Sequence, residues 1–508
     1  MSKFFNAKRV TALSMSILMA TTLMLSGCGK DSASGDTSIS SQTSGSEATN
    51  TQKEELKPYE IVWNTIGTPM KDTEMVFQEV SKYTKEKFNA TVKMNIFDWS
   101  KYEEKMQVIV QSGEQYDIAF TCSWALPYEQ MVAKNAFLPV DDLLEKHGKG
   151  IKEILSPLFL EGNKVKGKLY AVPNNKELSP QNVFTFNKKL VEKYNMDVSK
   201  VKTLQDLEPL METIKKNEKD IVDIFGADAG VYHQVDYVLG ASPAFVIPYD
   251  STDGKIVNMY DIPKVKEDTK TLNKFYKAGY LRKDIATFEG MDRTKSDKWF
   301  VYEGTWLPGS DESTWNKQGI TPVVSVPQFE KTYITNNHIS GSMLGISVTS
   351  QDPERVMMFL NLLNTDKYLR NLVDSGIENV HYKMENGKQV DLQQGIDNYN
   401  MSSFSLGNVF LLNLTPEEPD DKWEQYKKLN DSALKSPILG FKANIDGIKK
   451  EIAAFENIQK EFVNLMANGV IEIDEILPKY MDKMNAAGYE KVKAELQKQL
   501  DDWKATQK

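Results

Sequence analysis

The sequence predicts an α/β protein with two lobes, parallel sheets and a helical C-terminal region. Strand-like and helix-like patterns alternate over residues 59–120, which is typical of a parallel sheet covered by helices. About 450 residues follow the N-terminal segments, more than one hydrophobic core usually holds, so at least two lobes are expected. From about Ala443 onward, apolar residues keep helical spacing, which predicts a region built from helices.

The chain begins with the pattern of an export signal. Three basic residues and no acid precede an apolar stretch over residues 10–25. That stretch is too short for a membrane span, which needs about 20 residues. The next motif, Leu25-Ser26-Gly27-Cys28, resembles the lipobox of bacterial lipoproteins. The resemblance implies that Cys28 is lipidated and becomes the mature N-terminus; the alternative is a plain N-terminal anchor helix.

Residues 28–56 are expected to form a disordered tether behind this anchor. They are rich in Ser, Thr, Gly, Asp and Glu and contain almost nothing apolar to bury. An anchor followed by a tether predicts a protein that works outside the membrane. Cys122 is the only other cysteine, so no internal disulfide is expected.

The charge of the chain disfavours one class of partner. The net charge is −9, and the removed leader contributes only positive charge, so the exported protein is more acidic still. This sign disfavours nucleic acid as a partner. Lys and Glu are interspersed along the chain, which is typical of ordinary solvated faces and names no ligand.

The first predicted sheet starts at Tyr59. Strands are expected over 59–63, 91–97 and 116–120, with helices over 75–88 and 102–110. Ligands bind at the carboxyl ends of the strands in such sheets. The residues expected in the loops at these ends are Asn64, Asp98, Trp99, Ser123 and Trp124.

A crossover into a second lobe is expected next. Residues 167–174 predict a strand punctuated by Gly and Pro, and residues 183–195 predict a strand leading directly into a helix. A further α/β stretch continues to about Trp306. A short apolar run over 343–348 then precedes Asp352-Pro353, where Asp as N-cap and Pro at the first helical position predict a helix start.

Several segments, taken in order, resemble a known family. YDIAF (116–120), GKLYAVPN (167–174) and YEGTW (302–306) are similar to the extracellular solute-binding proteins of carbohydrate ABC importers. GIENVHY (376–382) and SPILGF (436–441) are among the segments similar to the LipO-like lipoprotein subfamily, which has an additional C-terminal domain.

This resemblance implies a two-lobe, periplasmic-binding-protein-like fold of type II that holds its ligand in a cleft and closes by hinge bending. It also guides the expected domain boundaries. These are 1–27, a lipoprotein signal peptide; 28–56, the lipidated Cys and tether; 57–172 with about 333–375, the N-terminal lobe; 173–332, the C-terminal lobe; and 376–508, a helical region packing on the lobes.

The resemblance also points to the binding residues. Trp306 matches the family's Gly-x-Trp position, which places an aromatic face on a sugar ring. Sugars combine apolar C–H faces with a rim of hydroxyls, so aromatic rings, carboxylates and amides suit them. The predicted ligand-binding residues are Trp306, Trp124, Trp99, Asp98, Ser123, Tyr232, His233 and Asn64.

The predicted function is that of a membrane-anchored, monomeric receptor on the extracellular face, which passes an oligosaccharide to ABC permease subunits. A receptor for peptides or another small polar solute is the alternative, followed by a surface adhesin or a glycoside hydrolase. No catalytic residue, cofactor or metal site is predicted, because the chain has no G-x-S-x-G elbow, phosphate loop or paired histidines. For His338 and His381, a cleft or hinge role and simple local hydrogen bonding are left open.

Overall fold

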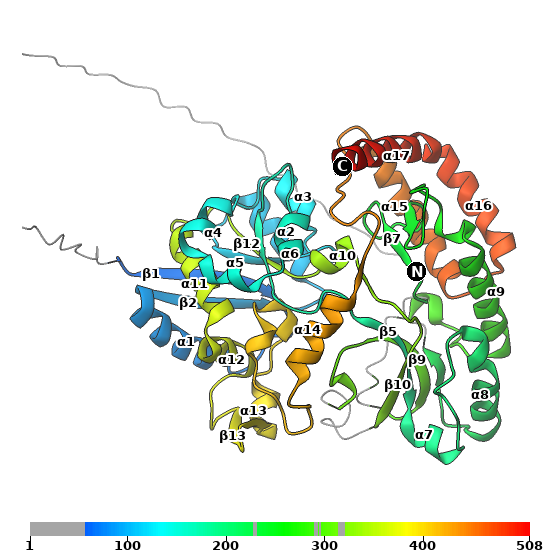
Figure 1. Ribbon diagram of the computed structural model, residues 1–508, viewed down its shortest axis with the longest axis horizontal. Helices are drawn as coiled ribbons and strands as arrows, with labels where there is room; N and C mark the ends of the chain where they lie inside the picture. The colour runs from blue at the N-terminus through cyan, green and yellow to red at the C-terminus, as the bar shows by residue number, and fades with distance from the viewer. Residues whose placement is uncertain (1–55, 227–230, 289–292, 294–295, 313–320, 508) are drawn as a thin grey trace, which may run out of the picture. The chain divides into compact units, whose positions relative to one another are not determined.

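The computed structural model describes residues 56–226, 231–288, 293, 296–312 and 321–507 (Figure 1). The predicted signal peptide, the lipidation site at Cys28 and almost all of the expected tether lie outside the described residues. Residues 56–508 group as one compact unit, and the elements below belong to it.

A five-stranded sheet forms the first lobe, in the order β2-β1-β3-β12-β4. Its strands are β1 (Tyr59–Ile66), β2 (Ala90–Phe97), β3 (Ile118–Thr121), β4 (Ala171–Pro173) and β12 (Met343–Ile346). β1 runs parallel to β2 and β3, as predicted, whereas β12 is antiparallel to both β3 and β4. The sheet is therefore mixed, because β12 enters it from the second lobe in the opposite direction.

Helices of the first lobe pack around this sheet. They are α1 (Thr73–Phe88), α2 (Tyr102–Ser112), α3 (Tyr128–Ala133), α4 (Asp141–His147), α5 (Lys149–Ile154), α6 (Pro157–Gly162), α11 (Pro353–Thr365) and α12 (Lys367–Ser375). The predicted start of α11 is confirmed: the Asp352 side chain accepts a hydrogen bond from Arg355 N at 2.9 Å, and Pro353 occupies the first turn.

The segment after α12 also belongs to the first lobe. It contains the hairpin β13 (Tyr382–Glu385) and β14 (Lys388–Asp391) together with α13 (Gln393–Asn398) and α14 (Lys422–Ser432). Tyr399, Met401 and Leu406 lie in the first-lobe core. The boundary expected at residue 376 therefore falls inside this core, and the C-terminal residues that pack with the second lobe begin only at Ile438.

A four-stranded sheet forms the second lobe, in the order β10-β5-β9-β6. Its strands are β5 (Gln181–Asn187), β6 (Asp223–Gly226), β9 (Trp299–Trp306) and β10 (Val323–Pro327), and its helices include α7 (Lys188–Lys193), α8 (Leu204–Asn217) and α9 (Pro263–Ala278). β5 is antiparallel to β9 and β10, and only β6 and β9 are parallel. The expectation of parallel sheets is thus wrong here, because β5 comes from the first lobe and β10 leads back to it.

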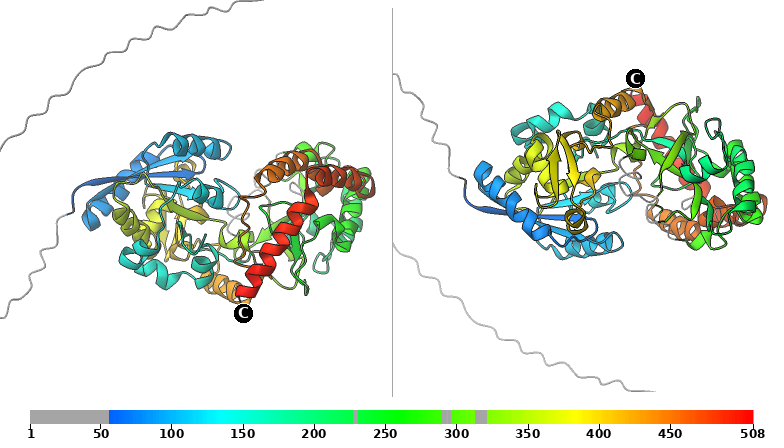
Figure 2. Two further views of the ribbon diagram at one scale, coloured as in Figure 1. Left: turned by 90° about the horizontal axis from the view of Figure 1, so that it is seen from above. Right: turned by 90° about the horizontal axis from the view of Figure 1, so that it is seen from below.

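The last three helices share a core with the second lobe. They are α15 (Lys449–Ala467), α16 (Ile473–Ala486) and α17 (Tyr489–Thr506), close to the predicted positions. Phe245, near the pair β7 (Val235–Tyr237) and β8 (Val246–Pro248), has its ring 5.8 Å from Phe455 and 5.2 Å from Tyr489. Figure 2 shows these orange and red helices beside the green segments of the second lobe.

The chain crosses between the lobes through segments that pair with each other. β11 (Tyr333–Ile334), on the way back to the first lobe, runs parallel to β15 (Leu434–Lys435), on the way to the C-terminal helices. The Asn336 side-chain amide donates to the Ile438 carbonyl at 2.8 Å and accepts from Gly440 N at 2.8 Å. The C-terminal region is therefore joined to the crossover as well as to the second lobe.

Candidate functional site

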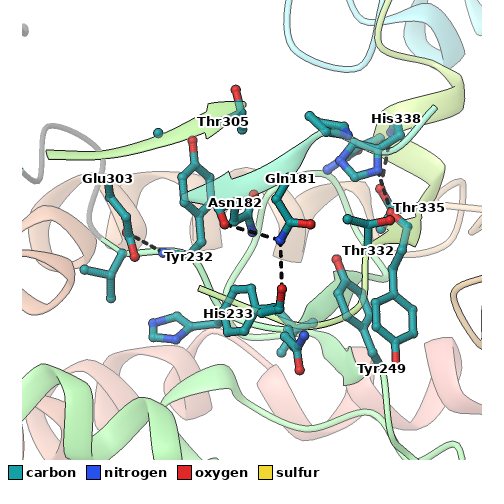
Figure 3. A pocket seen from close by; sticks show the side chains of 18 of the residues that line it. Gln181, Asn182, Tyr232, His233, Tyr249, Glu303, Thr305, Thr332, Thr335 and His338 are labelled. Carbon is teal, nitrogen blue, oxygen red and sulfur yellow. Dashed lines mark hydrogen bonds between the residues drawn. The ribbon is translucent and has the colours of Figure 1, made fainter. Parts of the chain in front are cut away.

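A cavity of about 660 Å³ opens where the second-lobe sheet meets the crossover. It is lined by the start of β5, the end of β9, the segment 231–237 that leads into and includes β7, Tyr249, and residues from 329 to 338. The last of these segments includes α10 (Asn336–Ile339), which contacts α6 of the first lobe. The second lobe and the crossover therefore form the walls (Figure 3), and the crossover segment joins them to the first lobe.

Amide and hydroxyl groups at the strand ends form one wall. The β5–β9 register places Gln181 opposite Trp306 and Asn182 opposite Thr305. The Gln181 amide donates to the Phe329 carbonyl at 2.9 Å, which orients it in the cavity (Figure 3). Because amides and hydroxyls both donate and accept hydrogen bonds, this wall suits a ligand with many hydroxyl groups.

Two tyrosines form an aromatic wall. The rings of Tyr249 and Tyr333 stack with their centroids 4.3 Å apart and an angle of 23° between the planes. Tyr249 N also donates to the Gln234 carbonyl at 3.0 Å, which fixes the loop that carries it. Stacked rings are rigid apolar surfaces of the kind that sugar C–H faces contact.

His338 is held in a neutral form. Its Nδ1 lies 3.0 Å from the Tyr333 carbonyl oxygen, which can only accept, so Nδ1 carries the proton in this contact. His338 N donates to the Thr335 hydroxyl, the cap of α10, at 3.2 Å. Burial lowers the pKa of His338 to about 4. The other ring nitrogen is thus an acceptor at neutral pH.

Burial also moves the pKa of three further cavity side chains towards the uncharged form. Burial raises the pKa of Glu303 to about 8 and that of Asp236 to about 6. Burial, with the charge of Lys264 adding to it, lowers the pKa of His233 to about 4. The Arg293 guanidinium is neutralised by Asp223, whose Oδ2 lies 2.6 Å from Nη2. The site is therefore polar, with Glu303 and both histidines uncharged at neutral pH, and Asp236 and Lys331 as its further titratable side chains.

A second aromatic surface lies on the first lobe. Trp99 and Trp124, both half-exposed, have ring centroids 6.3 Å apart and planes 18° apart, and Phe404 lies within 6.3 Å of each. Trp124 Nε1 donates to the Gly341 carbonyl at 3.0 Å. This hydrogen bond joins the aromatic surface to Gly341, three residues after His338 in the sequence. His338 itself lines the cavity.

The predicted residues therefore fall into three groups. Tyr232 and His233 line the cavity. Trp99 and Trp124 form the aromatic surface, and the neighbouring Ser123 donates its backbone N–H to the Ser340 carbonyl at 3.0 Å. Trp306 ends β9 directly after Thr305, a lining residue, without itself being among the residues that line the cavity.

Two further predicted residues have local roles. Asn64 does not follow β1 but lies within it, because the strand continues to Ile66; its buried side chain accepts from Asn95 Nδ2 at 2.9 Å. The Asp98 carboxylate is exposed and accepts from the Ser100 amide and hydroxyl at 3.0 and 2.7 Å, which stabilises the turn before α2.

Sequence reasoning missed much of the cavity. Glu303 lies inside the YEGTW motif beside Trp306 and could have been found there. The amide wall, Tyr249 and Tyr333 carry no local signal, since the fold brings them together from separate segments. His338 lines the cavity, whereas His381 is buried in the first lobe with Nε2 3.5 Å from Asp72.

Within the residues that the structure describes, no group of three or more His, Cys, Asp or Glu side chains is arranged to hold a metal ion. None of the helices in this part of the chain is both long enough and apolar enough to cross a membrane.

Comparisons with known proteins give a consistent result. Residues 68–369 match a family model described as bacterial extracellular solute-binding protein, and residues 437–505 match one described as a domain of unknown function. A carbohydrate ABC transporter substrate-binding protein of Streptococcus pneumoniae is 32% identical over 445 residues, covering 86% of this chain and 89% of that protein.

Solved structures of a pneumococcal protein are also similar. The N-glycan transport solute binding protein (NgtS) from Streptococcus pneumoniae has a TM-score of 0.82 at 32% identity, over 89% of this chain and all of that one. Its complex with Man5GlcNAc has a TM-score of 0.76 at 32% identity, over the same shares.

Proposed function

Because the chain belongs to the bacterial extracellular solute-binding protein family, we propose that it is the receptor of a carbohydrate ABC importer and captures an oligosaccharide in the cavity between its lobes. It binds its solute without transforming it, as expected of a family of substrate-binding proteins. The observation that carries the proposal is 32% identity, across nearly the whole chain, to a protein solved with N-glycan fragments.

The chemistry of the cavity supports a neutral glycan. Its walls offer amides, hydroxyls and the stacked rings of Tyr249 and Tyr333, which match the hydroxyl rim and the C–H faces of sugar rings. Its histidines are neutral at pH 7, and burial disfavours charge on its carboxyl groups. Two basic residues line the cavity, Lys331 and Arg293, and Arg293 is paired with Asp223, whereas a phosphorylated or strongly acidic ligand would call for a cluster of available basic side chains.

We further propose that Trp99 and Trp124 extend the site for longer glycans and that Trp306 contacts the ligand from the end of β9. Each ring is at least partly exposed, and Trp124 is joined through Gly341 to the segment that carries His338. For Ser123, Asp98 and Asn64 we propose a supporting role beside this surface: the Ser123 backbone N–H and the Asp98 and Asn64 side chains each make a hydrogen bond within the protein.

Lipidation of Cys28 and a monomeric state are also proposed. The support for the anchor is the order of basic, apolar and Leu-Ser-Gly-Cys segments at the N-terminus. An extracellular receptor held in this way would meet its permease at the membrane surface, and residues 28–56 would give it the reach to do so.

The test is a binding screen of the purified protein by thermal shift and calorimetry, because a ligand that binds the native state raises the melting temperature. The panel contains Man5GlcNAc, shorter N-glycan fragments, unrelated neutral oligosaccharides, peptides and small anions. Selective stabilisation by one class of neutral glycan is expected. Stabilisation by peptides or anions alone would leave the family assignment in place and overturn the ligand.

A further inference from the structure

The carboxyl group of Glu303 occupies an unusual position in the cavity. It lies on β9, two residues before the exposed Thr305, and lines the cavity. Its Oε2 accepts a hydrogen bond from Tyr232 N at 2.8 Å (Figure 3). The side-chain amide of Gln328, a buried residue that also donates to the Val183 carbonyl at 3.2 Å, hydrogen-bonds the same carboxyl group.

The groups that act most strongly on Glu303 are the two hydrogen-bond donors, Tyr232 and Gln328, and one acid. Asp268 on α9 is the acid whose charge acts on it, and Lys264 holds that carboxylate at 2.8 Å. His233 Nδ1 lies 3.9 Å from Asp268. Among the described residues, no ion pair joins Glu303 itself to a cation. The protein thus supplies hydrogen bonds to the acceptor sites of this carboxyl group without a positive charge to keep it ionised.

We propose that Glu303 is a specificity-determining residue that remains protonated and donates a hydrogen bond from its carboxyl O–H to an oxygen atom of the bound oligosaccharide. A protonated carboxyl has one donor and keeps its acceptor capacity. Tyr232 N and the Gln328 amide both donate to the Glu303 carboxyl group, so neither of these bonds accepts from its O–H. The O–H is therefore left to donate to the ligand. Its partner is a sugar hydroxyl, ring or acetamido oxygen. This inference rests on the proposed function.

The electrostatics of the site agree with this geometry. Burial raises the pKa of Glu303 to about 8, against the effect of the hydrogen bonds from Tyr232 and Gln328. The other cavity groups with shifted pKa values change charge elsewhere, at about 6 for Asp236 and about 4 for His233 and His338. A change in ligand affinity between pH 7 and 9 would therefore report on Glu303.

The experiment measures binding of Man5GlcNAc, which has no group that titrates in this range, to the purified protein between pH 6 and pH 9.5. Wild-type affinity should be constant at the acid end and fall by up to about tenfold for each pH unit above the Glu303 pKa. Calorimetry in buffers of different ionisation enthalpy should detect proton uptake on binding near pH 8.

Three variants sharpen the test. Glu303→Gln carries N–H donors at every pH, so it should bind within a few-fold of wild type at pH 6 and show neither the pH dependence nor the proton uptake. Glu303→Ala should weaken binding at least tenfold throughout. Glu354→Gln, which alters a half-exposed acid on α11, should follow the wild-type profile. Thermal melting confirms that each variant is folded.

A wild-type protein that binds with a flat pH profile and no proton uptake would overturn the inference while leaving the proposed function intact. So would a folded Glu303→Gln variant with strongly weakened binding at pH 6, since that result would require a carboxylate acceptor. If the wild-type protein bound no oligosaccharide at any pH, the proposed function would fail and this inference with it.

Discussion

Tyr249 stacks on Tyr333 with ring centroids 4.3 Å apart, and this contact joins a loop of the second lobe to the crossover that returns to the first. Tyr249→Ala should weaken glycan binding about tenfold, because it removes one aromatic face and frees the other. Calorimetry with the best ligand of the screen checks this. Tyr368→Ala, which removes an exposed ring on α12, serves as the control and should bind normally.

Trp124→Ala should discriminate between glycans of different length. If its ring extends the site, the loss of affinity will be larger for Man5GlcNAc than for Man1GlcNAc. The matched control is Trp423→Ala, another first-lobe tryptophan, which packs on Phe410 and Tyr426 instead. Equal losses for both glycans would place Trp124 at the main subsite, and no loss would exclude the aromatic surface from binding.

Trp306→Ala should weaken ligand binding with little effect on the melting temperature, because its partly exposed ring ends β9 beside the cavity. Binding is measured by calorimetry and stability by thermal melting of the same samples. An unchanged affinity together with a large drop in melting temperature would make Trp306 a packing residue.

Cys28→Ser should release the protein from the membrane fraction, since serine has no thiol to carry the lipid. Fractionation of cells producing either form, followed by immunoblotting, is the measurement. Retention of the serine variant on membranes after removal of the signal peptide would show that another anchor exists.

The neutral state of His338 predicts an acid-sensitive contribution to stability. Its pKa is about 4 in the folded protein and about 6.5 when unfolded, so the unfolded chain binds more protons between these values. The contribution of His338 to the free energy of unfolding is fully present above pH 6.5. It falls as the pH drops towards 4, by roughly 3 kcal/mol at most.

The comparison for this prediction is His338→Asn, whose amide can replace the Nδ1–H donor. The raised pKa values of Glu303 and Asp236 make stability change with pH in the opposite direction. Both residues are present in wild type and variant, so their effect cancels in the difference between the two proteins. The free energy of unfolding from urea titrations should therefore favour wild type over the variant more at pH 7 than at pH 4.5. A difference that does not change with pH would contradict the neutral buried histidine.

Local patterns predicted the elements better than they predicted strand directions. Short stretches of sequence predicted the Asp352-Pro353 cap, the first three strands and the C-terminal helices. The structure contains each of them close to the predicted place. The direction of a strand in its sheet depends instead on the path of the chain, because a strand that follows a passage through the other lobe can enter the sheet in the opposite direction. β12 follows the second lobe in sequence but completes the first-lobe sheet, so the order of elements alone could not reveal its antiparallel pairing.

The candidate site was predicted in part for the same reason. Trp99 follows β2 and Trp124 follows β3, two parallel strands on either side of β1, so the rule that strand ends share one edge of the sheet brought them together correctly. Tyr249 and Tyr333 meet only because the crossover passes the residues that follow β8. Asn64 was misplaced because β1 continues three residues beyond Trp63, and a strand end cannot be read to that precision from an apolar run.

The position of β12 between β3 and β4 also constrains how the chain can fold as it is made. The entire second-lobe sheet is synthesised after β4 and before β12, so the first lobe cannot complete its own sheet until most of the second has emerged. The core of the second-lobe sheet consists of buried residues within 184–326 and can form before β12 appears, whereas the core shared with α15 to α17 is completed last. The first lobe therefore closes only after the second-lobe sheet has been made, through contacts between residues far apart in the sequence.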